Sequence, residues 1–517
     1  MARYKHYDYN QTQMVPLSFA EQLMPGTLEY AIHEVIENRM DLSVFAQRYN
    51  NDKTGRKAYS PATMLKLTLL GYSRGMMGSR KLERACRENI TFMAITCGQK
   101  PDHSAIAAFI SSMSEEEIAN LFTHVLLVCE QEDLLGGTHF SLDGLKLPSN
   151  ASKEWSGTLS DLREKKETLE QKVKEAVKEH KEIDGCGVDS DNERLERKID
   201  KLKKSAERIE GFLNENKPKE GCSGKEIQSN ITDNDSAKLK TAQGVQQGYN
   251  ANAVVDEDNQ VIVNAEVFGS EPDSRVMDSM LKGTKANLEA AGIEEPLKDK
   301  TVSADTAYFS SENLKACSEH EVDAYVPDPQ FRKRDPRFAQ AQRHRRSVDR
   351  DKQKYKSKKR WFSVDDFHFD DQKNKLICPN GKALYVRNRN FKTKDGYKAI
   401  AYQAPKKACR NCPLRSKCLR NPDSKEGRQV HIFYGDRPGS LTDAMKQKID
   451  TPEGRKTYSK RLGIVEPVFG NIRARKGMNR FTLRSKKKVN IQWLLYCIVH
   501  NLEKVAHYGY SYAPATI

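Results

Sequence analysis

Three acidic residues lie at positions from which they could catalyse phosphodiester chemistry. Asp143 ends the alternating, strand-like segment THFSLDG (138–144), and Asp305 follows the strand-like start of KTVSADTAYFS (300–310). Glu466 lies in YSKRLGIVEPVFGNIRARKG (458–477), which we expect to be helical. Cutting and joining a phosphodiester takes two divalent cations about 3.5–4 Å apart, and Mg²⁺ prefers carboxylate ligands. We therefore predict that these three residues are catalytic and hold Mg²⁺ or Mn²⁺.

Each of these residues also has a structural interpretation. An aspartate at the end of a strand is usually a cap or a turn former, and Glu466 could be an ordinary solvated helix residue. Pro467 disfavours helical geometry in the residue before it, so the Glu–Pro pair predicts a kink or the start of a helix. The catalytic interpretation is favoured because chain order, element type and the motif described next agree.

The segment around Glu466 resembles the Tyr–Arg–Glu–Lys signature of the DDE-type transposases of bacterial insertion sequences. Tyr458, Arg461 and Glu466 match this signature, and the EPVFG run at the glutamate is typical of one branch of the family. Arg473 stands where the signature has lysine. Both are cations, but arginine binds phosphate with a planar fork whereas lysine is a point charge. This departure concerns the phosphate contact and not the reaction class.

Further segments extend the resemblance over most of the chain. SLDGLKL around Asp143 and ADTAYFS around Asp305 are similar to the family's two aspartate motifs, and GYNANAVVD (248–256) resembles the strand between them. The helical N-terminal region resembles the domain that precedes these catalytic cores. The resemblance implies a ribonuclease-H-like core with the triad Asp143, Asp305 and Glu466.

Basic residues follow the glutamate. Residues 473–488 contain eight Lys or Arg and no acid, and the whole chain carries a formal charge of +16. Such a run is often a solvated face, but directly after a metal-binding glutamate it favours contact with the DNA backbone and predicts binding that weakens steeply with salt. The residues expected to bind DNA are Tyr458, Arg461, Arg473, Arg475, Lys476 and Arg480.

Four of the eleven cysteines form a candidate zinc site, namely Cys378, Cys409, Cys412 and Cys418. The Cys–x2–Cys pair places two thiolates on one turn, and the other two could complete a tetrahedral structural site. The alternative is four reduced thiols in a small insert. Zinc is favoured because we expect so short and polar a segment to lack a core of its own. A similar cysteine insert occurs in the transposase branch named above.

The surrounding chain predicts an α/β fold with several insertions. Strands and helices alternate after residue 136, and YNANAVVDEDNQVIVNAEVF (249–268) predicts a hairpin. The helical N-terminal region binds the DNA ends or is a plain helical bundle. The predicted parts are the helical N-terminal domain (1–135), the first part of the ribonuclease-H-like core (136–153 and 221–330), an antiparallel coiled-coil hairpin inserted into it (154–220), a basic insert with the four cysteines (331–445), and the C-terminal part of the core with Glu466 (446–517).

These expectations combine into one hypothesis. The protein is an enzyme that recognises the inverted ends of its own mobile element as a homodimer. Metal-activated water cuts DNA at the element's end, and the freed 3′ hydroxyl attacks target DNA in the same site. One alternative is a nuclease on the same fold that cuts without joining. The other is a non-catalytic DNA-binding protein derived from a mobile element.

Composition also sets where we expect the protein to act. No apolar run reaches the roughly eighteen residues of a transmembrane helix, and the first residues lack the apolar core of a signal peptide. Mean hydropathy is −0.77. We therefore expect no membrane partner and a reducing cytoplasm. The resemblance to insertion-sequence transposases implies that this is a bacterial cytoplasm, with the protein at the nucleoid.

Overall fold

The structure is a computed structural model that describes residues 16–49, 57–183, 189–221, 224–241, 244–340, 361–370, 375–392, 398–421, 423–433 and 441–512. The chain divides into two compact units, one formed by Met1–Pro327 with Pro452–Ile517 and the other by Asp328–Thr451. Most of the basic segment expected around residues 330–360 lies outside the described residues. None of the described helices has both the length and the apolar character that crossing a membrane requires.

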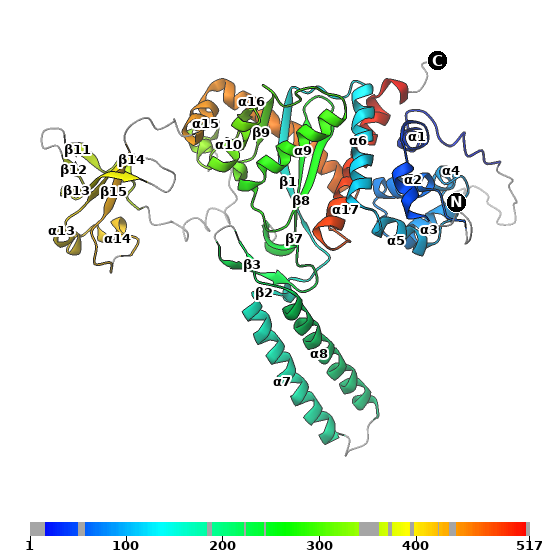
Figure 1. The fold of residues 1–517 in the computed structure, drawn as a ribbon, viewed down its shortest axis with the longest axis horizontal. Coiled ribbons are helices and arrows are strands. Elements are labelled where there is room, and N and C mark those ends of the chain that lie inside the picture. The colour runs from blue at the N-terminus through cyan, green and yellow to red at the C-terminus, as the bar shows by residue number, and fades with distance from the viewer. Residues whose placement is uncertain are drawn as a thin grey trace, which may run out of the picture. The chain divides into compact units, whose positions relative to one another are not determined.

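The larger unit is built on a six-stranded mixed sheet (Figure 1). In spatial order it contains β10 (Asp323–Tyr325), β9 (Thr301–Ala304), β1 (His139–Pro148), β7 (Gly244–Asp256) and β6 (Ala237–Thr241), and β8 (Ile262–Phe268) also pairs with β7. β10, β9 and β1 are parallel, whereas β7 is antiparallel to each of its neighbours. This arrangement confirms the mixed α/β fold and the hairpin predicted over 249–268.

Four helices of the larger unit pack on or beside this sheet, namely α9 (Met277–Ala290), α10 (Ser311–Glu319), α16 (Pro452–Gly470) and α17 (Lys486–Tyr508). α9 turns an amphipathic face inward, burying Met277, Met280, Leu281, Thr284 and Leu288. α10 follows the N-cap Ser310, whose hydroxyl accepts a hydrogen bond from the backbone N–H of Asn313. α16 contacts β1 and β9, so it is the helix that can reach the ends of these two strands.

Helix α17 also covers the edge of the sheet at β8. Asn501 accepts a hydrogen bond from Ile262 N (2.9 Å) and donates one to Ile262 O (2.8 Å), and Asn490 accepts one from Val267 N (3.0 Å). An open strand edge presents unpaired backbone groups that invite pairing with another chain. Two asparagine side chains therefore satisfy backbone groups that β7, on the other side of β8, cannot reach.

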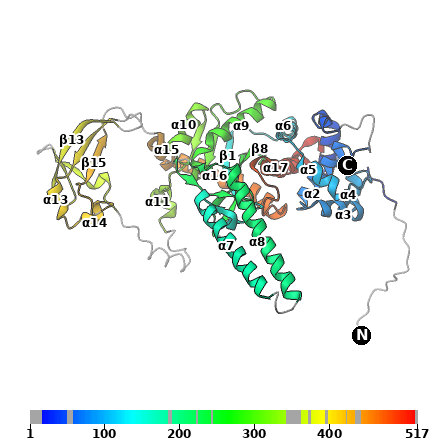
Figure 2. The same ribbon diagram turned by 60° about the horizontal axis from the view of Figure 1, so that its bottom comes forward.

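The N-terminal part of the larger unit is helical, as predicted (Figure 2). α2 begins after the N-cap Ser60 with Pro61 in its first turn, and Ser114 and Glu117 form a reciprocal capping box at α6. α1, α2 and α6 all contact α17. The helices are α1 (Leu28–Glu34), α2 (Pro61–Ser73), α3 (Ser79–Glu88), α4 (Ile90–Ile95), α5 (His103–Ser111) and α6 (Glu115–Gln131).

Two long helices, α7 (Leu159–Ile183) and α8 (Asp189–Glu215), lie side by side within the predicted insertion (Figures 1 and 2). Leu159 and Leu162 at the start of α7 pack against Ile209 and Phe212 near the end of α8, so the helices are antiparallel. At their base lie the short strands β2 (Ser156–Gly157), β3 (Lys219–Glu220), β4 (Glu226–Ile227) and β5 (Ser229–Asn230). A helical hairpin therefore occupies the expected place, and its coiled-coil character remains a prediction.

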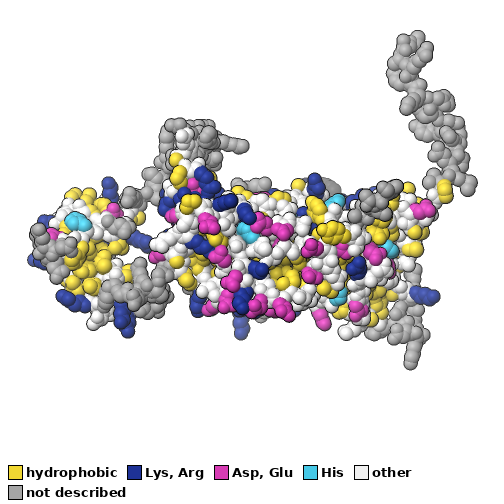
Figure 3. Space-filling view, turned by 90° about the horizontal axis from the view of Figure 1, so that it is seen from above, with side chains coloured by type: hydrophobic (Ala, Val, Ile, Leu, Met, Phe, Trp, Pro, Cys, Tyr) yellow, Lys and Arg dark blue, Asp and Glu magenta, His cyan; other side chains and the backbone are white. Residues whose placement is uncertain are grey.

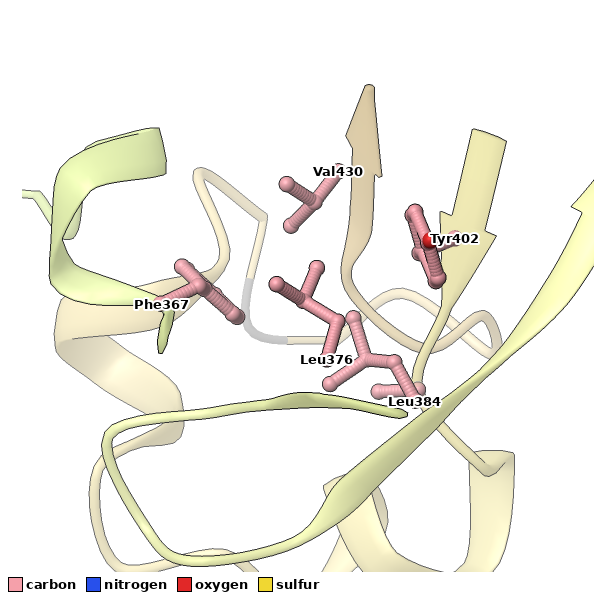
Figure 4. Packing of buried hydrophobic residues seen from close by; sticks show 6 residues of the cluster. Phe367, Leu376, Leu384, Tyr402 and Val430 are labelled. Carbon is pink, nitrogen blue, oxygen red and sulfur yellow. The ribbon is translucent and has the colours of Figure 1, made fainter. Parts of the chain in front are cut away.

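The smaller unit contains an antiparallel sheet with the strand order β11 (His368–Asp370), β12 (Lys375–Ile377), β13 (Ala383–Lys392), β14 (Lys398–Gln403) and β15 (Gln429–Phe433). The side chains of Phe367, Leu376, Leu384, Tyr402 and Val430 pack together on one side of it (Figure 4). The expectation that this segment lacks a core is therefore wrong, because apolar residues from distant strands converge. The helices of this unit are α11 (Phe331–Arg334), α13 (Lys406–Arg410), α14 (Arg415–Cys418) and α15 (Leu441–Asp450).

Candidate active site

Strands β1 and β9 bring the two predicted aspartates together. The parallel register pairs His139 with Thr301 and Leu142 with Ala304, so Asp143 and Asp305 are the next residues on neighbouring strands. One expectation needs correction, because β1 does not end at Asp143. It continues to Pro148 along β7, and only its parallel neighbour β9 stops at Ala304. Asp143 therefore lies within β1, just beyond the point at which the neighbouring strand β9 ends.

Arg461 of α16 links the two aspartates. Its Nη1 lies 2.8 Å from Asp143 Oδ2, its Nη2 lies 4.0 Å from Asp305 Oδ1, and only 7 % of its side chain is exposed. The other oxygen of Asp143 accepts a hydrogen bond from Gly144 N (2.8 Å). Burial raises the pKa of Asp143, although the Arg461 charge opposes this shift. Arg461, which the sequence suggested as a DNA contact, is thus a buried counter-ion in this structure.

Glu466 lies on the same helix but is exposed. No hydrogen bond or ion pair joins it to either aspartate among the described residues, and no group of three or more His, Cys, Asp or Glu side chains there is arranged to hold a metal ion. Five residues on an α-helix correspond to a turn of about 140°, so Arg461 and Glu466 leave α16 in different directions. The helix presents Arg461 to Asp143.

Helix α16 continues through Pro467, where the sequence predicts a kink or a helix start. Proline has no N–H to donate to the carbonyl of Gly463 one turn earlier. That carbonyl instead accepts a hydrogen bond from Gln260 Nε2 (2.9 Å). The helix then widens into a π-helical turn, η9 (Asn471–Arg475), which carries Arg473.

A pocket of about 660 Å³ opens beside the two aspartates. Its lining includes Asp143, Asp305, Asp273, Tyr308, Lys146, Lys240, Arg473 and Asn479. Asp273 is a third carboxylate that the sequence analysis did not identify. It belongs to the short helix η4 (Asp273–Arg275) before α9, and no motif marks it. Its place in the pocket depends on strand pairing and was not visible from spacing along the chain.

The electrostatics of this pocket fit a hard divalent cation. Burial raises the pKa of Asp273, and the charges of Asp143 and Asp305 raise it further, while Lys146 lowers it. Carboxylates that are partly buried close together destabilise their own ionised forms, and a bound cation relieves this repulsion. The oxygen donors are also those that Mg²⁺ and Mn²⁺ prefer.

The basic residues after α16 fall into two groups. Arg473, Arg475 and Arg480 are exposed, and Arg473 reaches the pocket. Lys476 instead is fully buried and pairs with Glu503 of α17, so it presents no charge to solvent. The basic run itself did not indicate that Lys476 is buried, because its partner Glu503 is distant in sequence. Basic and acidic side chains are interspersed on the face drawn in Figure 3, so that face offers no field of a single sign.

Tyr458 packs close to the arginine of the same signature. The Arg461 guanidinium lies 5.9 Å from the centre of its ring, within the range of a cation–π contact. Tyr458 is half-buried and therefore supports Arg461 from one side.

The four cysteines of the smaller unit converge. Cys378, Cys409, Cys412 and Cys418 line one small pocket of about 30 Å³. Burial raises the pKa of Cys418; Arg428 lowers it, and the other three thiols raise it. Their mutual influence places the four thiols near one another, although, as for the carboxylates, the described residues include no group already arranged around a metal.

Two family models match the chain. The model described as a transposase DDE domain matches residues 377–506, which include Tyr458, Arg461 and Glu466. A model described as a transposase domain matches residues 18–112, within the N-terminal helices. A search among curated proteins finds no match. Over these two segments the chain matches the DDE-type transposases of insertion sequences, enzymes that use divalent metal ions to cleave DNA and to transfer its strands.

Proposed function

We propose that Asp143, Asp305 and Glu466 are the metal-binding triad of this transposase and that the sheet around them is a ribonuclease-H-like core. The observation that carries the proposal is the register of β1 and β9, which makes the two aspartates neighbours on parallel strands. Helix α16, within the segment that matches the DDE domain, packs against both strands and carries Glu466.

In this proposal Asp143 and Asp305 hold magnesium or manganese, and Glu466 completes the ligand set once DNA and metal are bound. When bound, the metal ions activate the attacking oxygen and stabilise the leaving oxygen. The chain's own task is to bring the carboxylates, the DNA strand and the pocket together. Arg473 at the pocket is placed to bind a phosphate with its planar fork, in place of the lysine of the signature.

The DNA substrates in this proposal are the inverted ends of the element and a target duplex. The exposed cations Arg473, Arg475 and Arg480 bind the DNA backbone, and the N-terminal helices contact the ends. A homodimer holds two ends together in the bacterial cytoplasm, at the nucleoid. The antiparallel hairpin α7–α8 then serves either as a contact between subunits or as a surface over DNA.

The decisive experiment is cleavage of labelled DNA that carries the element's ends, with Mg²⁺, by the wild type and by Asp305→Ala. We expect cleavage by the wild type and a loss of at least about 10³-fold in the variant, since the metal site supplies most of the catalysis. Glu289→Ala, which removes an exposed carboxylate on α9, is the control and should cleave normally. Equal cleavage by Asp305→Ala would exclude the triad.

A second assay separates a transposase from a nuclease with the same fold. DNA whose end has already been cut is supplied with a target duplex, so that only the joining step remains. Joined products that disappear in Asp305→Ala would support strand transfer at the same site. Cleavage without any joining would favour the nuclease, and DNA binding that is insensitive to metal, with neither reaction, would favour a non-catalytic protein.

We also propose a structural zinc ion at the four cysteines of the smaller unit. Their convergence on one small pocket supports it. Because this unit has an apolar core as well, zinc is expected to stabilise it rather than to be the sole reason that it folds. Elemental analysis of protein purified without chelator should find about one zinc per chain in the wild type and much less in Cys412→Ser. An absence of zinc from the wild type would remove this proposal.

A further inference from the structure

Asp273 stands in the pocket of the proposed metal site although it belongs to no transposase motif named above. It lines the pocket together with Asp143 and Asp305, whereas Glu466 does not. The charges of both aspartates also raise the pKa of Asp273. Three carboxylates therefore surround one pocket before Glu466 is considered.

A hydrogen bond from Asn250 of β7 holds the side chain of Asp273 in place. Asn250 Nδ2 donates a hydrogen bond to Asp273 Oδ1 (2.5 Å). Asn250 is on β7, where it pairs with Lys146 of β1, three residues after Asp143. The other oxygen, Oδ2, accepts no hydrogen bond from the described part of the chain. One oxygen thus anchors the side chain and the other is left for a ligand.

Buried polar groups without partners give a second, independent indication of a ligand. Tyr308 lines the pocket, is 1 % exposed and has no hydrogen-bond partner for its hydroxyl among the described residues. Asn250 Oδ1 and the side-chain amide of Asn252 also lack partners among the described residues, but neither asparagine lines the pocket. A buried polar group of this kind costs about 1–3 kcal/mol unless it finds a partner. The orphaned hydroxyl of Tyr308 at the pocket therefore indicates that water or a hydrated ion belongs there.

The two asparagines lie directly over the residue that follows Asp143. A Cβ built on Gly144 would come within 2.3 Å of Asn252 Oδ1 and within 2.7 Å of Asn250 Oδ1. Glycine therefore allows both amides to approach the strand next to the carboxylate. Asn250 connects this part of β7 to the pocket through its hydrogen bond to Asp273.

The buried Asp256 of the larger unit is satisfied by the protein itself, because it accepts hydrogen bonds from the backbone of Gly136, Gly137 and Asp258. Asp233 accepts a hydrogen bond from the hydroxyl of Tyr249 through one oxygen, while its Oδ2 is buried without a partner among the described residues, but it does not line the pocket. Asp273 differs from both because it lines the pocket together with two further carboxylates.

We propose that Asp273 is a further carboxylate ligand of the divalent cations at the Asp143–Asp305 pocket, and that water bound to the cation satisfies Tyr308. This inference rests on the proposed function, because it takes the same pocket to be the metal site. It adds a ligand from η4 to those of β1, β9 and α16. The orphaned hydroxyl of Tyr308 then orders the hydration shell of the ion.

The test is Mn²⁺ binding to the full-length protein, measured by calorimetric titration without DNA. We expect Asp273→Asn to lower Mn²⁺ affinity by about tenfold or more, because a change of ligand should cost at least as much as a change in the supporting shell. The matched control, Asp200→Asn, removes an exposed aspartate of α8 and should leave the affinity unchanged. Melting with and without Mn²⁺ should show a smaller metal-induced rise in Tm for Asp273→Asn than for the wild type.

A second variant tests contact with the ion even if Asp273→Asn does not fold. Asp273→Cys replaces the carboxylate with a thiolate, a soft ligand that favours Cd²⁺ over Mn²⁺. We expect this variant to bind Cd²⁺ more tightly than the wild type does and Mn²⁺ more weakly. Unchanged preference between the two metals would overturn the assignment of Asp273.

The outcomes for Asp273 and for the proposed function are distinguishable. If Asp273→Asn binds Mn²⁺ like the wild type while Asp143→Asn and Asp305→Asn do not bind it, the inference is wrong and the proposed site stands. If all three variants bind Mn²⁺ like the wild type, the metal site itself is wrong. Loss of binding in all three supports both.

Discussion

Arg461 is a cation already placed between two carboxylates that are proposed to bind metal. Its ion pair with Asp143 is largely shielded from solvent, and its charge offsets part of the cost that burial imposes on the Asp143 anion, whose pKa is raised on balance. Metal binding must then exchange one positive partner for another. This arrangement keeps the carboxylates ordered while the metal is absent.

We therefore predict that Arg461→Gln lowers the free energy of unfolding of the metal-free protein by about 2–3 kcal/mol. Removing one partner of a fully buried ion pair costs about 3–5 kcal/mol. The loss should be smaller here, because 19 % of the Asp143 side chain is exposed and water can partly solvate its charge. Mg²⁺ should restore part of the loss. Urea unfolding with and without Mg²⁺ measures this, with the exposed Arg475→Gln as control. Equal stability of Arg461→Gln and wild type would show that the pair contributes little.

His500 of α17 gives a prediction about pH. Burial lowers its pKa from the ordinary 6.5 to about 3. Its Nε2 lies 2.9 Å from Gln260 O and its Nδ1 lies 3.1 Å from Asn471 Nδ2, so the neutral ring can donate to the first and accept from the second. The unfolded chain binds a proton below pH 6.5 that the folded chain excludes. This contribution to stability is therefore complete above pH 6.5 and is lost as the pH falls toward 3.

The expected loss is about 1.4 kcal/mol per pH unit below pH 6.5. His500→Gln keeps a donor and an acceptor but cannot be protonated, so its stability should fall less steeply between pH 6.5 and 5. His507→Gln, an exposed position on the same helix, should behave like the wild type. Parallel pH profiles for His500→Gln and wild type would contradict the prediction.

Among single residues, the sequence predicted those at which a motif of the family and a strand pattern occur together. Asp143 and Asp305 were predicted for that reason, and the structure makes them neighbours. The burial of Lys476 and the position of Asp273 in the pocket could not be predicted. Their partners, Glu503 and Asn250, are distant in the chain. Burial and partners of single charged residues depend on tertiary contacts that a local pattern does not contain.

Among the elements, α17 has two tasks. It packs on the sheet and it also satisfies the backbone edge of β8 with asparagine side chains. The amphipathic pattern of a helix predicts the first task only. The second task requires an amide side chain level with the backbone group of β8 that lacks a partner.

We predict that Asn501→Ala lowers the free energy of unfolding by about 2–4 kcal/mol. It leaves both the N–H and the C=O of Ile262 without their partner, and each buried unsatisfied group costs about 1–3 kcal/mol. Chemical denaturation measures the change, and Asn38→Ala, at an exposed position of the N-terminal helices, is the control. A loss no greater than that of Asn38→Ala would mean that water replaces the asparagine at this edge.

The helix α16 shows why an element can differ from its sequence pattern. Pro467 predicted a kink or a helix start, yet the helix continues because Gln260 Nε2 donates a hydrogen bond to the carbonyl of Gly463, which proline leaves without an N–H partner. Proline rules describe the cost of a missing hydrogen bond, and here a loop residue from another part of the chain removes that cost.

For the whole molecule, the exposed and buried cations after α16 predict two different behaviours. Arg475→Gln should weaken DNA binding uniformly and reduce the slope of log affinity against log salt by about one. Lys476→Met should leave that slope unchanged and destabilise the protein, because it leaves Glu503 without its partner. Binding titrations at several salt concentrations separate the two. A reduced slope for Lys476→Met would show that this lysine reaches DNA.

The mixed α/β fold followed from the sequence, whereas the apolar core of the smaller unit did not. Alternating strands and helices predict the mixed sheet, and the helical N-terminal region is helical. The predicted insert was expected to lack a core, because its apolar residues are few and scattered along the chain. Strand pairing collects them into one cluster, and no window along the sequence contains that information.

The larger unit is formed by the N-terminal and C-terminal parts of the chain, and the residues of the smaller unit come between these parts in the sequence. During synthesis, residues 139–325 therefore emerge well before α16 and α17 exist. A nascent chain has Asp143 and Asp305 but neither Arg461 nor Glu466, and its β8 edge lacks Asn490 and Asn501. With the proposed triad, the enzyme becomes competent to cut DNA only after α16 has been translated, and a prematurely terminated chain would carry an open strand edge prone to aggregation.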